Sequence, residues 1–136
     1  MDTGPLVAYV DRRDRAHQAV AAVLEPFTGQ LITTSAVITE SMYFLSDVSG
    51  GPLALAELIT AASTLIVDLV EPEALREAAR LMEKYRDTPM DFADATLVIA
   101  SDRVAVTDVL TLDRRGFSTY RTAKRRPFRI IECSHV

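Results

Sequence analysis

Four acidic residues stand where the chain passes from one apolar segment to the next, and they are Asp2, Glu40, Asp94 and Asp113. Carboxylates brought close together repel one another, and burying them without a partner is costly. A hard divalent cation neutralises such a group, and it can also activate water for attack on a phosphodiester. The combination therefore predicts one acidic metal site with hydrolytic chemistry.

Each acid also has an ordinary structural explanation. Asp113 with Gly116 three residues later fits a type I turn. Asp91 and Asp94 have the spacing of a helix N-cap and its third residue, and we interpret Asp91 as such a cap. Glu40 taken alone fits an exposed acid on a helix. Asp2 taken alone fits a hydrated acid beside the chain start. Only the four acids together indicate chemistry.

Other catalytic groups are poorly represented. The two histidines, His17 and His135, are expected on the surface, and the sequence has neither zinc-ligand spacing nor a glycine-rich phosphate loop. A phosphohydrolase that uses Asp2 as its nucleophile would need a second Asp two residues later, where this chain has Gly4. These observations favour carboxylate–metal chemistry over the alternatives.

The composition suits one globular domain over residues 1–136, with about half of the residues apolar. The most apolar stretch, 53–70, is interrupted by Glu57 and Asp68, so no membrane span is expected. No signal peptide is recognisable. The single Cys133 excludes an internal disulfide and favours a reducing compartment, so we expect a cytoplasmic protein.

The net charge of −4 argues against a polyanionic partner, but the cations are unevenly distributed. Basic residues cluster near the start and in the last quarter of the chain, either as a nucleic-acid footprint or as solvated faces. They are Arg12, Arg13, Arg15, Arg114, Arg115, Arg121, Lys124, Arg125, Arg126 and Arg129.

The apolar pattern predicts strands that alternate with helices. Strands are expected at 31–34, 65–69, 106–112 and 128–131, and helices over 14–24, from 34 or 35, from 52, over 72–85 and over 90–103, with 3–10 as a helix or loop. We expect Asp14 to cap the helix over 14–24, and Val37, Tyr43 and Phe44 to point inward. This order predicts an α/β domain with a mainly parallel sheet covered on both faces. Ligands of such sheets lie beyond the carboxyl ends of the strands.

The chain resembles PIN-domain proteins, and more closely the VapC-type toxins of type II toxin–antitoxin systems. The resemblance covers nearly the whole sequence and rests on these segments: Asp2 to Ala8, Thr33-Thr34 followed by a helix with Glu40, Ala93-Asp94-Ala95, and Leu110 to Phe117. It implies a three-layer α/β/α sandwich and a metal-dependent endoribonuclease that cleaves RNA.

The resemblance also implies residue roles. Asp2 and Asp94 would be the principal ligands of Mg²⁺ or Mn²⁺, Glu40 and Asp113 would complete the site, and Thr3 and Thr111 would orient the carboxylates. It further implies a small antitoxin partner and a homodimer, for which the helices around 37–45 and 53–65 are candidate interfaces. The alternative is a nuclease-inactive PIN module that binds RNA or a protein, although all four acids are retained.

The sequence departs from the family pattern before Asp2. Members of this family usually have an apolar strand there, in the middle of the sheet, whereas only Met1 precedes Asp2. We therefore expect a truncated first strand, a gap beside its neighbours and weak anchoring of the Asp2 backbone. The hypothesis that translation starts further upstream is testable by mass spectrometry of the native protein.

Overall fold

The computed structural model describes residues 1–134, so His135 lies outside the described residues. Helices and strands alternate as predicted, and every strand has three residues. The elements are α1 (Thr3–Val10), α2 (His17–Leu24), β1 (Ile32–Thr34), α3 (Ser35–Leu45), α4 (Gly51–Ala61), β2 (Leu65–Val67), α5 (Pro72–Lys84), α6 (Phe92–Val104), β3 (Asp108–Leu110), α7 (Arg114–Thr119) and β4 (Arg129–Ile131).

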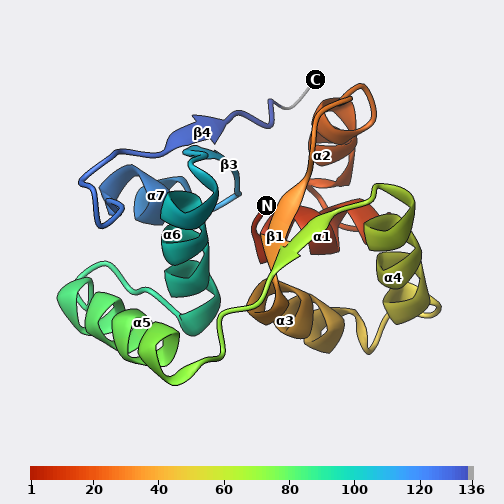
Figure 1. Ribbon diagram of the computed structural model, residues 1–136. Coiled ribbons are helices and arrows are strands. Elements are labelled where there is room, and N and C mark those ends of the chain that lie inside the picture. Colours follow the sequence, from red (N-terminus) through yellow and green to blue (C-terminus); the bar gives the residue numbers. More distant parts are fainter. Residues whose placement is uncertain (135–136) are drawn as a thin grey trace.

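The strands form two parallel pairs. β1 pairs with β2 and β3 pairs with β4, and Figure 1 shows the two pairs lying apart. Met1 and Asp2 join them, because the Met1 amine donates to Ile32 O at 2.6 Å and Asp2 N donates to Leu110 O at 3.0 Å. The predicted α/β class with parallel strands is confirmed, while the sheet is interrupted at its middle.

The Asp2 backbone is better anchored than the short first strand suggested. Besides the two bonds to β1 and β3, Thr33 Oγ1 donates to Met1 O at 2.8 Å. Asp2 is only 7% exposed. Met1 and Asp2 therefore take the place of a central strand here, because Met1 bonds to β1 and Asp2 bonds to β3.

The helices divide between the two strand pairs. In Figure 1, α1 to α4 gather around β1 and β2, while α7 lies beside β3 and β4 and α5 packs on α6. α6 also packs on α3 and β1, so it connects the two groups. The most deeply buried helix is α6, in which residues 95–101 are all buried. A helical segment that is buried on all sides belongs in the core, and the first turn of this helix carries Asp94.

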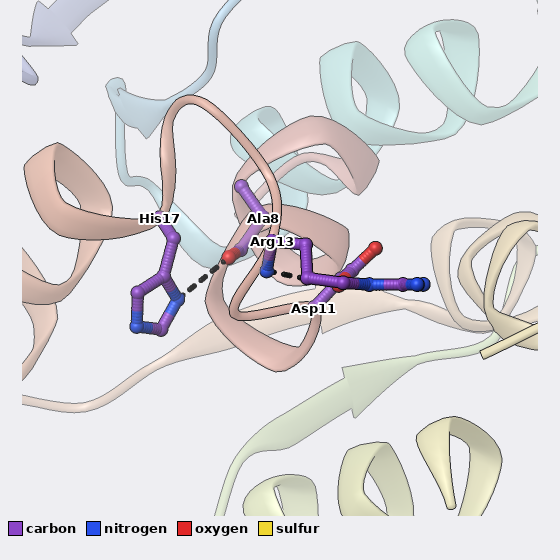
Figure 2. A network of polar contacts seen from close by, with 4 residues as sticks. All are labelled: Ala8, Asp11, Arg13 and His17. Atoms are coloured by element: carbon purple, nitrogen blue, oxygen red, sulfur yellow. Dashed lines mark hydrogen bonds and ion pairs between the residues drawn. The ribbon is translucent and has the colours of Figure 1, made fainter. Parts of the chain in front are cut away.

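The corner between α1 and α2 is held by polar contacts (Figure 2). A ring nitrogen of His17, Nδ1, is 2.9 Å from Ala8 O, and Arg13 N donates to Asp11 Oδ1 at 3.0 Å. His17 is partly buried, not a plainly solvated histidine. The prediction that Asp14 caps this helix is wrong. Asp14 Oδ1 accepts from Ala16 N in the preceding turn, and α2 begins at His17.

The inward orientation predicted for the α3 aromatics is also wrong. Val37, Ser41 and Leu45 are buried, whereas Tyr43 is 75% exposed and Phe44 is 55% exposed. Successive helical residues are about 100° apart, so Tyr43 points away from the buried stripe and Phe44 lies at its edge.

Within residues 1–134, every helix is too short or too polar to cross a membrane. Cys133 is a free, partly buried thiol. Helix α7 was not expected from the sequence, and it begins where a turn after Asp113 was predicted.

Candidate functional site

The four predicted acids line a single hollow of about 570 Å³, to which they come from four separate segments. Asp2 follows the N-terminal link, Glu40 comes from α3, Asp94 from the first turn of α6, and Asp113 from the turn after β3. We call this hollow the acidic hollow; it is lined by Asp2, Thr3, Gly4, Val7, Asp14, Glu40, Phe44, Asp91, Asp94, Leu112 and Asp113.

The Asp2 carboxylate is oriented by hydrogen bonds on both oxygens. Oδ1 accepts from Thr3 N at 2.7 Å, and Oδ2 accepts from Thr111 Oγ1 at 2.6 Å. Burial nevertheless raises the pKa of Asp2 above its ordinary value, and the two hydrogen bonds oppose that rise. Asp2 thus has a fixed orientation in surroundings that disfavour its charge.

Asp94 and Asp91 form a capping box at the start of α6. Asp91 Oδ1 accepts from Asp94 N at 2.8 Å, and Asp94 Oδ2 accepts from Asp91 N at 3.1 Å. Burial, followed by the negative charges of Asp2 and Asp91, raises the pKa of Asp94 to about 8. The interpretation of Asp91 as a cap is confirmed, and its side chain also lines the acidic hollow.

Glu40 also lies in surroundings that disfavour its charge. Burial raises its pKa, the charges of Asp91 and Asp2 add to the rise, and the Thr3 hydroxyl opposes it. Thr3 Oγ1 itself is buried and makes no hydrogen bond of ordinary geometry with any described residue. An unsatisfied buried hydroxyl on a residue that lines the acidic hollow is a candidate contact for a ligand or ordered water.

Asp113 has a local role as the N-cap of α7. Its Oδ1 accepts from Gly116 N at 2.9 Å, and its own N donates to Thr111 Oγ1 at 2.9 Å. Thr111 therefore touches both Asp2 and Asp113. The bond to Gly116 begins α7 in place of the expected type I turn, and Asp113 also lines the acidic hollow.

Tyr120 lies beneath the site and is affected by the combined charge. It is fully buried and its hydroxyl donates to Pro89 O at 2.8 Å. Burial and the negative charges of four nearby acids hold the pKa of Tyr120 above its ordinary value; these acids are Asp94, Asp113, Asp91 and Asp2. A shared influence on one phenol indicates that the acids converge.

The side chains suit a divalent cation by type but are not arranged around one. Among residues 1–134, no group of three or more His, Cys, Asp or Glu side chains has an arrangement that would hold a metal ion. The carboxylates of Asp2, Asp94 and Asp113 are turned toward local N–H and hydroxyl donors. Their oxygens are nevertheless the ligand type that Mg²⁺ and Mn²⁺ prefer.

Some residues that line the hollow had been given other roles. Asp14 was expected to be a helix cap and Phe44 to be a core residue, yet both line it. Phe44 follows Glu40 by four residues, which places both on one side of α3, and this spacing was an available signal. Asp14 had none, because its position depends on how the loop before α2 folds back.

Comparisons with known proteins agree on one family. The model of the PIN domain family matches residues 1–123. Ribonuclease VapC26 of Mycobacterium tuberculosis (strain ATCC 25618 / H37Rv) is 31% identical over 133 residues, which cover 96% of this chain and 98% of that protein. The crystal structure of Mycobacterium tuberculosis VapC20, described as a sarcin–ricin loop cleaving toxin, has a TM-score of 0.70 at 15% identity and covers 79% of this chain and 83% of its own. The latter likeness concerns the fold.

Proposed function

The chain belongs to the PIN domain family, and on this premise we propose that it is a metal-dependent endoribonuclease. The observation that carries the proposal is the gathering of Asp2, Glu40, Asp94 and Asp113 from four segments into one hollow. The family match and the ribonuclease relative support RNA as the substrate. The carboxylate oxygens gathered in this hollow are the ligand type that Mg²⁺ and Mn²⁺ prefer, which supports a requirement for a cation.

The proposed roles follow the contacts of each side chain. Asp2 and Asp94 are the principal ligands for Mg²⁺ or Mn²⁺, and Glu40 and Asp113 complete the site. A bound cation would lower the pKa of an attacking water and stabilise charge that develops on the phosphodiester. Thr111 holds Asp2 Oδ2 in place, and Asp91 positions Asp94 through the capping box.

The biological setting that we propose is a toxin paired with a small antitoxin, acting as a homodimer. The VapC26 relative supports the pairing. Leu53 on α4 is 67% exposed, so the candidate interface helix around 53–65 carries an uncovered apolar side chain. The molar mass of the purified chain by light scattering tests the homodimer. The same measurement after co-expression with the product of an adjacent small gene tests the antitoxin.

An RNA-cleavage assay tests the activity. We expect the full chain to cleave RNA with Mg²⁺ or Mn²⁺, and an excess of EDTA to abolish cleavage. Loss of a group that only orients a metal ligand typically lowers activity or metal affinity about 10–100-fold. Asp94 is proposed as a ligand itself, so Asp94→Asn should lower the cleavage rate at least about 100-fold. The exposed Asp47→Asn is the matched control and should retain activity.

The outcomes separate the candidate functions. Cleavage that survives both EDTA and Asp94→Asn would contradict the proposal. RNA binding without cleavage, in every divalent cation tested, would instead support the nuclease-inactive module.

A further inference from the structure

A second hollow, of about 830 Å³, adjoins the acidic hollow, and we call it the side groove. Its walls come from one face of α3, the loop after β2 and the start of α6. Glu40 and Asp91 line both hollows, so the two lie next to each other. The Ser35 hydroxyl donates to Asp68 Oδ1 at 2.7 Å and ties α3 to the loop after β2. The volume lies within the range of roughly 300–1,000 Å³ that is usual for ligand sites.

Apolar side chains line much of the side groove and are open to solvent. Tyr43 is 75% exposed, Val70 is 58% exposed, and Phe92 is partly buried. Tyr43 packs edge-to-face with Phe44 at 5.6 Å between ring centroids. Because Phe44 lines the acidic hollow and Tyr43 lines the side groove, this aromatic pair spans the two. Uncovered aromatic side chains beside a candidate active site indicate a binding surface.

The charges of the side groove are of one sign. Its charged lining residues are Glu40, Asp68 and Asp91, and no Lys or Arg is among the described residues that line it. Such a surface repels phosphate groups, whereas it suits an uncharged planar ring whose amino groups donate to carboxylates. Aromatic side chains stack with every nucleobase, and single-stranded RNA is commonly recognised in this way.

We propose that the side groove binds one unpaired nucleobase of the RNA, next to the phosphodiester that is cleaved in the acidic hollow. The base stacks on Tyr43, while the acidic rim keeps the phosphate backbone out of the groove. This inference rests on the proposed ribonuclease function, since it assigns the groove to a nucleotide adjoining the cleavage point. Tyr43 is a binding residue in this assignment and touches the substrate without taking part in the chemistry.

Cleavage kinetics and RNA binding by Tyr43 variants test the assignment. Full-length Tyr43→Ala should raise KM, and the Kd for an RNA oligonucleotide in EDTA, roughly 5- to 100-fold, the range expected for loss of one stacked base. Because binding alone is affected, kcat should change much less. Tyr43→Phe retains the ring and should stay within about twofold of the unmodified chain. Leu75→Ala should do the same, because Leu75 is an exposed apolar residue of α5 that lines neither hollow.

An oligonucleotide with an abasic site beside the cleaved bond gives the decisive comparison. If the base occupies the side groove, Tyr43→Ala and the abasic substitution should cost no more together than either costs alone. Independent, additive losses would overturn the assignment, as would an unchanged KM in Tyr43→Ala. A change in molar mass by light scattering, with RNA affinity intact, would assign the face to a protein contact instead. If the unmodified chain cleaves RNA and Tyr43→Ala is unaffected, only the groove assignment fails; if the unmodified chain neither binds nor cleaves RNA, the proposed function fails with it.

Discussion

Asp94 has a structural role and a charge that work against each other. Its carboxylate completes the capping box of α6, which favours the helix, but burial and the charges of Asp2 and Asp91 disfavour ionisation. A pKa near 8 means that, without a cation, the folded chain holds a proton that the unfolded chain loses at much lower pH. Asp94 therefore reduces stability at neutral pH, which is the cost expected of a site prepared for a cation.

The first prediction concerns the pH dependence of stability. Because the folded-state pKa of Asp94 is raised, its contribution to stability is present near pH 4 and is lost as pH rises toward about 8. Asp94→Asn keeps an acceptor for Asp91 N and carries no charge. In EDTA we expect this variant to exceed the unmodified chain by about 1–2 kcal/mol at pH 8, a figure reduced for the partial exposure of Asp94.

Urea unfolding between pH 5 and 8.5 measures this difference, which should shrink toward pH 5. The exposed Asp47→Asn should track the unmodified chain throughout. A difference that grows as pH falls would mean that the carboxylate of Asp94 is stabilised by folding, contrary to its surroundings here.

At the scale of elements, α7 matters because its cap is one of the site acids. Gly116 leaves room for the Asp113 carboxylate, since a Cβ on residue 116 would lie 2.3 Å from Asp113 Oδ2 and 2.9 Å from the Tyr120 hydroxyl. The Asp113–Gly116 bond thus fixes both the start of α7 and the position of a proposed ligand. Local helix capping and the proposed chemistry depend on the same atoms.

The second prediction follows from this crowding. Gly116→Ala should displace the Asp113 side chain and weaken the cap, at a cost of about 1–3 kcal/mol in stability. We also expect at least a tenfold loss of RNA cleavage under saturating Mg²⁺. Thermal unfolding and initial cleavage rates measure the two effects.

Ser118→Ala, an exposed change in the same helix, controls for alteration of α7 away from the cap and should retain activity. Unchanged cleavage in Gly116→Ala would remove Asp113 from the proposed ligand set.

Across the whole molecule, the net charge of −4 hides a separation of charge. The acidic hollow gathers negative side chains, while many of the cations lie in the C-terminal part of the chain. Arg114 pairs with Glu132 and Arg129 pairs with Asp108, so those two are partly neutralised. Arg115 is exposed and forms no ion pair with a carboxylate in residues 1–134, which leaves it available for phosphate.

The third prediction concerns salt. Each phosphate neutralised on single-stranded RNA contributes about −0.7 to the slope of log affinity against log salt concentration. Arg115→Ala should therefore reduce the slope by about 0.7 and weaken binding similarly for different RNA sequences. Anisotropy titrations between 50 and 300 mM salt, a range of roughly sixfold, would measure it.

Arg76→Ala, which removes an exposed cation paired with Glu73 on α5, is the control and should leave the slope unchanged. An unchanged slope in Arg115→Ala would place the RNA backbone on another face.

Most elements were predictable because their signals are local. Pro72 at a helix start, the Asp91–Asp94 spacing and the β-branched segment before Thr34 each act within a few residues. The order of helices and strands and the parallel pairing followed from those signals. Misplaced details, such as the start of α2 and the direction of Tyr43, depended on how neighbouring segments pack.

By itself, the amino-acid sequence determined the α/β class, the family resemblance and the choice of Asp2, Glu40, Asp94 and Asp113, because residue types and spacings carry that information. Only the tertiary structure decided that these acids share a hollow with Asp14, Asp91 and Phe44, and that a groove with Tyr43 adjoins it. It also decided that Met1 and Asp2 bridge two strand pairs. Proximity between residues distant in the chain is set by packing and by backbone pairing, and neither can be read from one segment at a time.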